Sequence, residues 1–389
     1  MIILLFYLTF YLNVYGNAQE VYIVAASQGS FIIKVGTPEQ RLLSKLSWEI
    51  SEMILVDINC GVHSECAAFC KDTFFASAYC SQACQPIHYA SESLTKCEYS
   101  SYWDVYHNIR NFDKFYPMNS SSIEFRQTKW SKWISGFAPF YGQIVRDQLS
   151  IQTNPNSDGK STSELSVQLE MIDTLLVVSN FMLLTTSVIG LAPGKENIVS
   201  QMYANDVIPQ PVVSIYAVNE DNGALTFGAY NQQNCTHWTH HKTVGNRWIL
   251  NVNNIEVNGF QYAVKSKVLF SLHTEYIYMP SNYLDFLVQS NVLIKWNDEG
   301  ELTSQYVYNC NQHLELNTMI DGQPIRLDER ILKFYPINES LCNAQIQAIT
   351  VIRPKKRYLY DVDFVFGSPF AYKYCVAFDY QLNNVGLFN

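Results

Sequence analysis

The sequence predicts an all-β protein arranged as two lobes. The chain has 389 residues, which is enough for two domains or for one large two-lobed fold. Its composition, with 14% aromatic and only 16% charged residues, is typical of a β-rich extracellular protein rather than of a disordered chain. Residues 21–35 alternate and are rich in β-branched side chains, so they predict strands near the N-terminus.

The segment 1–18 predicts a secretory signal peptide. An apolar run over residues 2–12 is followed by small residues that include Gly16 and Ala18. The run is too short to span a membrane comfortably. It has no basic segment at its start, and an uncleaved membrane anchor is the alternative interpretation. We expect a secreted protein, or one in the lumen of the secretory pathway, with no membrane association after cleavage.

Ten cysteines agree with an oxidising compartment. Six form one cluster and four follow later: Cys60, Cys66, Cys70, Cys80, Cys84 and Cys97, then Cys235, Cys310, Cys342 and Cys375. Two Cys-x3-Cys spacings in the cluster are compatible with zinc, but in a secreted chain they favour disulfides, and both groups have even counts. Three glycosylation sequons, at Asn119, Asn234 and Asn338, fit the same compartment.

The charge distribution gives no sign of a nucleic-acid partner. The net charge is −9, and the one basic cluster, residues 353–357, is interpreted as a solvated turn. His237, His240 and His241 could in principle ligate a metal, but a solvated hairpin end is the favoured interpretation because no acidic or cysteine partner is identified nearby. We expect no metal, no cofactor and no nucleic-acid binding, and we expect a monomer.

Two stretches near the start carry a resemblance to a known family. Residues 35–40 read VGTPEQ and residues 46–50 read LSWEI. They resemble the opening of a pepsin-like aspartic protease, in which a Gly-Thr-Pro-x-Gln segment is followed, eleven residues after its glycine, by an Asp-Thr-Gly loop with the first catalytic carboxylate. Counting eleven residues from Gly36 gives Ser47. The spacing is that of the family, and a serine stands where the carboxylate is expected.

The rest of the chain carries further segments of the same family in the same order. The tail reads DFVFGSPF over 363–370 and NVGLF over 384–388, similar to the family's Ile-Leu-Gly-Asp-Pro-Phe-Leu and closing Val-Gly-Phe segments. Further resembling segments lie at 189–192, 211–216, 223–228 and 248–259. The resemblance implies a bilobal all-β fold with a central cleft. Within the family the chain resembles secreted nematode-type homologues, and we expect it to be a catalytically degenerate member.

The resemblance also implies a domain layout and a disulfide pattern. We expect an N-terminal lobe over 19–209 with a cysteine-rich insertion at 60–116, and a C-terminal lobe over 210–389. Short helices are predicted at 198–205 and 283–289. Cys310 and Cys342 resemble the family's C-terminal-lobe pair. Cys235 and Cys375 match cysteines of some invertebrate relatives and remain as the second pair in this lobe.

The family's flap hairpin corresponds in sequence to residues 123–128. In this alignment Phe125 replaces the flap tyrosine and Arg126 replaces a glycine. The hairpin tip of the family needs glycine for its positive φ and for close approach to a substrate backbone. We therefore expect a bulkier tip, enlarged by residues 129–133.

Both catalytic loops of the family have changed. The second loop falls at 271–273, so that serine occupies both catalytic positions, Ser47 and Ser271. The loop residues that follow are replaced as well: Trp48 and Glu49 in the first loop, Leu272 and His273 in the second. Aspartic proteases need two carboxylates that share one proton and act as base and acid on a water molecule. Serine hydroxyls do not ionise usefully, so the sequence predicts no proteolysis.

Several functional interpretations follow from these replacements. We expect a non-proteolytic family member that binds an extended peptide or a protein segment in the cleft by strand pairing. A functional aspartic endopeptidase, as whole-domain similarity would imply, is one alternative. A glycan or partner binder that uses the Cys60–Cys97 region is another. Glu49 and His273 could also face each other near the two serines as a Ser-His-Glu arrangement, but no oxyanion donor is identified, and a polar contact that ties the lobes together is favoured.

Overall fold

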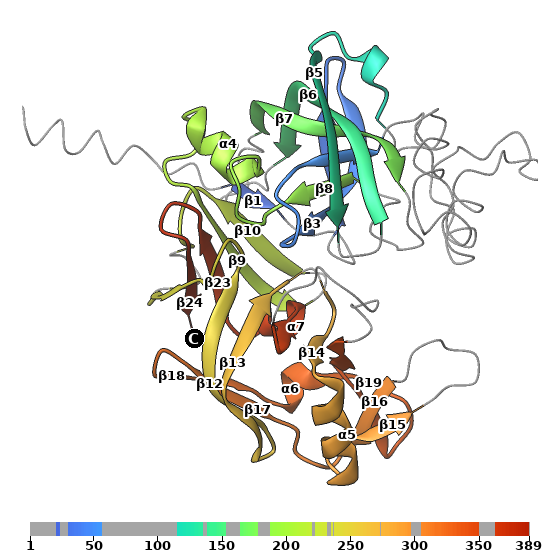
Figure 1. Ribbon diagram of the computed structural model, residues 1–389, viewed down its shortest axis with the longest axis vertical. Helices are drawn as coiled ribbons and strands as arrows, with labels where there is room; N and C mark the ends of the chain where they lie inside the picture. The colour runs from blue at the N-terminus through green and yellow to red at the C-terminus, as the bar shows by residue number, and fades with distance from the viewer. Residues whose placement is uncertain are drawn as a thin grey trace, which may run out of the picture.

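The structure is a computed structural model, and its description is confined to part of the chain. The described residues are 21–23, 30–56, 115–134, 138–152, 164–177, 187–219, 222–231, 235, 237–272, 274–296, 305–349 and 362–388. Strands in four sheets dominate this part, with a few short helices (Figure 1). The predicted all-β, two-lobed fold is confirmed.

The N-terminal lobe is one seven-stranded sheet in the order β2-β3-β8-β4-β7-β6-β5. Its strands are β2 (Ser30–Val35), β3 (Gln40–Ser47), β4 (Ile54–Val56), β5 (Glu124–Ile134), β6 (Ala138–Gln152), β7 (Glu164–Val177) and β8 (Ser187–Gly190). β2 also pairs with β6, so the sheet curls back on itself. Side chains inside the curl, among them Ile33, Leu42, Val145 and Leu149, are fully buried and form the core of this lobe.

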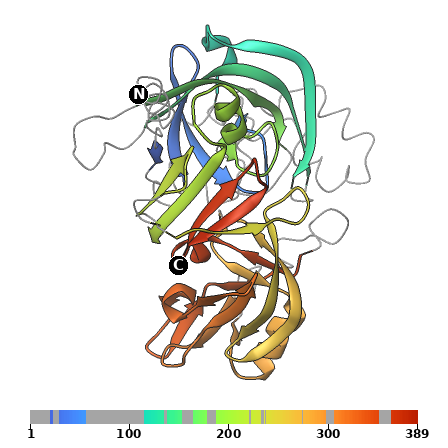
Figure 2. The same ribbon diagram turned by 90° about the vertical axis from the view of Figure 1, so that its left-hand side faces the viewer.

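A six-stranded sheet in the order β1-β10-β9-β23-β24-β11 joins distant parts of the chain. Its strands are β1 (Val21–Ile23), β9 (Val212–Asn219), β10 (Asn222–Phe227), β11 (Thr239–Lys242), β23 (Cys375–Asp379) and β24 (Asn384–Phe388). In Figure 1 it lies between the N-terminal sheet at the top and the other C-terminal sheets at the bottom. Figure 2 shows its red C-terminal strands beside the yellow-green strands β9 and β10.

Two further sheets complete the C-terminal lobe. The seven-stranded sheet has the order β18-β17-β12-β13-β22-β14-β21, and the four-stranded sheet has the order β15-β16-β20-β19. Their strands are β12 (Ile249–Val257), β13 (Phe260–Phe270), β14 (Ile277–Met279), β15 (Ile294–Trp296), β16 (Gln305–Asn309), β17 (Leu316–Ile320), β18 (Gln323–Leu327), β19 (Lys333–Pro336), β20 (Leu341–Ala344), β21 (Ile346–Ala348) and β22 (Phe364–Phe366). Asn258 and Gly259, both with positive φ, form the two-residue turn of the β12–β13 hairpin.

The described helices are short. They are η4 (Pro117–Asn119), α4 (Ile198–Ala204), α5 (Ser281–Gln289), α6 (Glu329–Leu332) and α7 (Ser368–Ala371). α4 and α5 confirm the two predicted helices, and the Asn197 side chain caps α4 by accepting a hydrogen bond from the Ser200 amide at 2.7 Å. None of the helices in the described part of the chain is long and apolar enough to cross a membrane.

The predicted lobe boundary near Pro209 falls in the connection from α4 to β9.

Two disulfides are formed in the C-terminal half, Cys235–Cys375 and Cys310–Cys342, with Cα atoms 6.3 and 5.1 Å apart. They are the two pairs expected for this lobe. Several other expectations lie outside the described residues: the signal peptide 1–18, the six cysteines Cys60 to Cys97, nearly all of the 60–116 insertion, Asn234, His273 and the basic cluster 353–357.

The expected position of the hairpin tip is wrong. Phe125 and Arg126 lie at the start of β5, and residues 129–133 continue the same strand to Ile134. Phe125 pairs with Val145, and Ile134 pairs with Ala138, so residues 129–133 belong to the paired strands and not to the tip; residues 135–137 are not among the described residues. Arg126 instead forms exposed ion pairs with Glu124 and Glu170 at the base of the hairpin. The tip lies further along the chain because cross-strand pairing with β6, not the local motif, sets the length of the hairpin.

Candidate functional site at the junction of the lobes

The first site loop begins where β3 ends. β3 runs parallel to β8, which places Ser47 opposite Gly190. The Leu191 amide donates to the Ser47 carbonyl oxygen at 2.7 Å, and the Ala192 amide donates to the Ile50 carbonyl oxygen at 2.9 Å. A Cβ atom at Gly190 would lie 2.3 Å from the Glu52 carbonyl oxygen, so this close approach requires glycine. The loop is therefore held tightly against the end of β8, and Ser47 is 1% exposed.

The second site loop is built on the same plan. β13 runs parallel to β22, which places Phe270 opposite Phe366. The Ser271 amide donates to the Phe366 carbonyl oxygen at 3.0 Å, and the Thr274 amide and hydroxyl both donate to the Ser271 carbonyl oxygen. Gly367 comes directly after β22 and lies as close to this loop as Gly190 lies to the first loop. A Cβ atom at Gly367 would be 2.3 Å from the Thr274 carbonyl oxygen. Ser271 is fully buried.

Glu49 connects the two loops. The Ser271 hydroxyl donates a hydrogen bond to Glu49 Oε1 at 3.0 Å, across 222 positions of sequence. The Glu49 amide donates to Ser47 Oγ at 3.3 Å, and Arg247 Nη1 donates to the Glu49 carbonyl oxygen at 3.2 Å. The two serines that sequence spacing singled out thus belong to one hydrogen-bonded arrangement. The expected contact of Glu49 with His273 stays a prediction, because His273 lies outside the described residues, and Ser271 is a partner of the Glu49 carboxylate.

An apolar base lies under these loops. Trp48 is 3% exposed and its ring lies 5.9 Å from that of Phe378, while Leu272 belongs to the same buried cluster. The Leu191 carbonyl oxygen accepts hydrogen bonds from Trp248 Nε1 and from the Tyr380 hydroxyl, each at 2.8 Å. Burial raises the pKa of the Tyr380 phenol well above its usual value, so it remains a donor. Trp48 and Leu272 therefore help to pack the lobes together where the family's loops carry small polar residues.

Two site residues were not predicted from the sequence. Glu52 is 8% exposed, and its carboxylate accepts hydrogen bonds from the Ser51 hydroxyl at 2.9 Å and from Trp130 Nε1 at 3.3 Å. Trp130 lies in β5, so this contact links the β5–β6 hairpin to the first site loop. The tryptophans within residues 129–133 were the available signal, because a buried indole N–H normally finds an acceptor.

The described residues offer no metal site, since no group of three or more His, Cys, Asp or Glu side chains among them could hold an ion. The expectation of a solvated hairpin end at the histidines is wrong for His241. His241 is 3% exposed, and its Nδ1 lies 2.9 Å from Asp321 Oδ2. It is buried because β11 pairs with β24 at the edge of the six-stranded sheet.

The chemistry available at the junction is limited. One carboxylate, Glu49, accepts a hydrogen bond from one buried serine hydroxyl, and the second hydroxyl belongs to Ser47. Burial raises the pKa of the nearby Tyr278 phenol, with smaller contributions from neighbouring groups that include Glu275 and Glu49. No pair of carboxylates occupies the two equivalent strand ends. The shared proton of an acid–base dyad therefore has no place at Ser47 and Ser271.

A comparison with protein-family models identifies the class. The model for eukaryotic aspartyl proteases matches residues 98–389, and the chain belongs to this family. No curated protein matches the chain in a sequence search. The matched region contains Ser271, whereas Ser47 precedes it. The equivalence of the two serines rests on the parallel pairings β3–β8 and β13–β22, which place both at the same point of the repeated plan.

Proposed function

We propose that this chain is a secreted, non-proteolytic member of the eukaryotic aspartyl protease family. The observation that carries the proposal is the pair Ser47 and Ser271 at the two equivalent strand ends, joined through Glu49. The hydrolytic mechanism of the family uses two adjacent carboxylates whose pKa values separate, so that one is a base while the other is an acid. Two serine hydroxyls cannot take these roles at any physiological pH.

Glu49 does not replace the missing pair. A single carboxylate could accept a proton from water, but peptide hydrolysis by this route also needs an acid to protonate the scissile carbonyl. The group bonded to Glu49 is the Ser271 hydroxyl, which is a far weaker acid than a carboxylic acid. An aspartic endopeptidase activity is thus not supported by the described site. A glycan-binding role of the Cys60–Cys97 region falls outside the described residues, and no observation favours it.

The retained role that we propose is binding of an extended peptide or protein segment in the cleft between the lobes. Strand addition supplies affinity through main-chain hydrogen bonds and needs no catalytic carboxylate. The two-lobed scaffold supports this role, as does the hairpin contact from Trp130 to Glu52. Secretion is supported by the two disulfides. Glycosylation is supported at Asn119 and Asn338, which are exposed.

The binding role is tested with peptides from a limited digest of denatured globin. Purified secreted protein is incubated with the digest at pH 5 and pH 7, and retained peptides are sized by mass spectrometry. We expect intact peptides to be retained by the wild-type protein. Retention should weaken in Trp130→Ala and stay unchanged in the matched control Trp296→Ala, because Trp296 lies on β15 in the four-stranded sheet.

Two outcomes would contradict the proposal in different ways. If no peptide is retained by the wild-type protein at either pH, the binding role is wrong and the non-proteolytic assignment stands. If peptides are shortened by the wild-type protein but not by Ser47→Ala or Ser271→Ala, the chain is an enzyme.

A further inference from the structure

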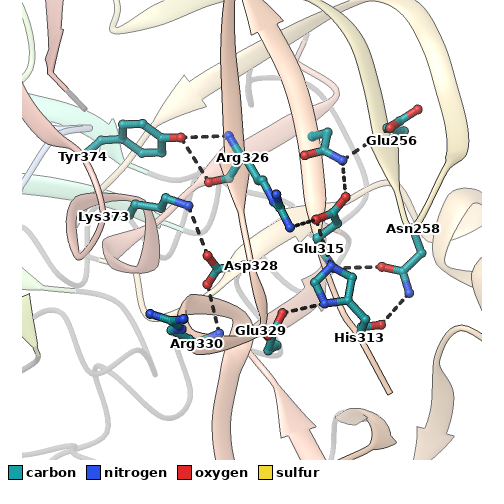
Figure 3. A network of polar contacts seen from close by, with 11 residues as sticks. Glu256, Asn258, His313, Glu315, Arg326, Asp328, Glu329, Arg330, Lys373 and Tyr374 are labelled. Carbon is teal, nitrogen blue, oxygen red and sulfur yellow. Dashed lines mark hydrogen bonds and ion pairs between the residues drawn. The ribbon is translucent and has the colours of Figure 1, made fainter. Parts of the chain in front are cut away.

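A polar network in the C-terminal lobe surrounds His313 (Figure 3). His313 lies in the connection between β16 and β17. Its Nε2 is 2.9 Å from Glu315 Oε2, and its Nδ1 is 2.8 Å from Glu329 Oε2. Glu315 belongs to the same connection, whereas Glu329 is the first residue of α6. The imidazole thus bridges two carboxylates that belong to separate elements.

Two carboxylates beside the ring favour a charged imidazole. A neutral imidazole has one N–H donor and one acceptor nitrogen, so one of its nitrogens would face a carboxylate oxygen without a proton between them. The imidazolium hydrogen-bonds Glu315 through Nε2 and forms an ion pair with Glu329 at Nδ1, where Glu329 Oε2 has no hydrogen-bond partner among the described residues. The proton on His313 is therefore what joins the β16–β17 connection to α6.

The backbone of His313 is held in place independently of that proton. Asn258, in the turn of the β12–β13 hairpin, donates from Nδ2 to the His313 carbonyl oxygen at 2.8 Å and accepts at Oδ1 from the Glu315 amide at 2.8 Å. Its own amide donates to the Glu315 carbonyl oxygen at 3.0 Å. The backbone that carries the imidazole is therefore held in place whether or not the ring is charged.

The two carboxylates are not equally fastened. Glu315 also accepts from Arg326 Nη2 at 2.6 Å and from Asn317 Nδ2 at 2.7 Å, and Asn317 in turn lies 3.4 Å from Glu256 Oε1. Within the described part of the chain, Glu329 has His313 as its partner. Loss of the proton should thus leave Glu315 in place and release Glu329, which is the arm that belongs to α6.

We propose that His313 is a proton-operated clasp that fastens the start of α6 to the β16–β17 connection in mildly acidic surroundings and releases it as the pH rises. The groups that face it are Glu315 from its own connection, Glu329 from α6 and Arg326 from β18. Arg326 is the one cation among them and is paired with Glu315. The net charge of the groups around the imidazole is therefore negative, and this favours the protonated, closed state of the clasp.

The sign of the pH dependence follows from the two shifted groups. The hydrogen bond to Glu315, supported by the charges of Glu329 and Glu315, raises the pKa of His313 above 6.5, against burial and Arg326. Its contribution is complete below 6.5 and is lost as the pH rises through the raised value. Hydrogen bonds from Asn317 and His313 lower the pKa of Glu315, so its contribution is lost only as the pH falls through that lowered value. The clasp is closed between these two limits.

The release of α6 can be followed at its own amides. The Ile331 and Leu332 amides donate to the Asp328 carbonyl oxygen at 3.0 and 2.9 Å, so their hydrogen exchange reports the first turn of the helix. Asp328 is held separately by Lys373 at 3.2 Å, which keeps α6 attached to the lobe when the clasp opens. The expected change is a local loss of protection and not an unfolding of the lobe.

The test combines a titration with hydrogen exchange on the full secreted protein. Histidine titration by NMR should give His313 a midpoint above about 6.5, the value of an unperturbed imidazole. After correction for intrinsic rates, protection of Ile331 and Leu332 should fall by severalfold between pH 5.5 and pH 8.5. Glu329→Gln and His313→Gln should abolish this difference, and the control His237→Gln should keep it.

The readouts separate the clasp from a merely structural role. A His313 midpoint at or below about 6.5 would overturn the proposal. So would protection of α6 that is independent of pH in the wild-type protein, or a pH difference that survives in Glu329→Gln. Peptide binding plays no part in these measurements, so they stand apart from the proposed function.

Discussion

The carbonyl oxygen of Leu191 offers a quantitative test of how the lobes are joined. Leu191 follows β8 in the N-terminal lobe, and its carbonyl oxygen accepts from Trp248 Nε1 and from the Tyr380 hydroxyl. Leu191 and Trp248 are fully buried. If either donor is removed, the Leu191 carbonyl oxygen still accepts a hydrogen bond from the other donor. Removal of both leaves a buried acceptor without a partner.

The magnitudes differ between the single and double changes. Tyr380→Phe should lower the free energy of unfolding by about 0.5–1.5 kcal/mol, the net value of one hydrogen bond. Trp248→Phe should cost more, since it also removes buried ring volume. The double variant adds the desolvation cost of an orphaned carbonyl, about 1–3 kcal/mol. The sum of the single losses should therefore fall short of the double loss by roughly 1 kcal/mol or more.

The assay is urea unfolding of the four proteins, followed by far-ultraviolet circular dichroism. A matched cycle combines Trp248→Phe with Tyr374→Phe, whose hydroxyl bonds to the Arg326 backbone instead. That cycle should be additive within about 0.5 kcal/mol. If the Trp248 and Tyr380 changes are also additive within that limit, the Leu191 carbonyl is not shared in solution and the reasoning fails.

Three further predictions concern other parts of the chain. Cys375→Ser and Cys235→Ser should each lower stability by about 4–5 kcal/mol, since the disulfide closes a loop with a sequence separation of 140; the double variant should be little worse in thermal melts, and unequal single effects would contradict the pairing. Ser47→Asp with Ser271→Asp should not restore cleavage of a fluorogenic peptide, because Trp48, Glu49 and Leu272 still occupy the loops; measurable turnover would show that the loops are intact. Tyr283→Phe should cost about 1–3 kcal/mol in urea unfolding, because its hydroxyl accepts from the buried Val257 amide at 2.9 Å and donates to the Phe260 carbonyl oxygen; a loss below about 0.5 kcal/mol would contradict this.

Much of the fold followed from short segments whose spacing along the chain is preserved. Ser47 was located by counting from Gly36, and the structure places it at the end of β3 beside Gly190, as Ser271 is placed beside the end of β22. The positions of the two serines are predictable because each loop directly follows its strand in the sequence. The glycine that packs on each loop lies in a segment with a recognisable motif.

The contacts across the molecule were not predictable in the same way. The hairpin was misplaced because its length depends on the pairing of β5 with β6, for example Ile134 with Ala138. The contact between Trp130 and Glu52 joins residues 78 positions apart, and no local pattern specifies it. The same holds for Glu49 and Ser271: both residues were candidates from their positions in the chain, but their hydrogen bond was not predictable.

The most direct test of the central claim is an acid proteolysis assay. Purified protein is incubated with denatured globin from pH 2 to pH 7, beside Ser47→Ala and Ser271→Ala variants, and new peptide termini are counted by mass spectrometry. We predict no new termini above the background of the two variants at any pH, because neither equivalent strand end carries a carboxylate. Cleavage by the wild-type protein that disappears in either variant would contradict the account.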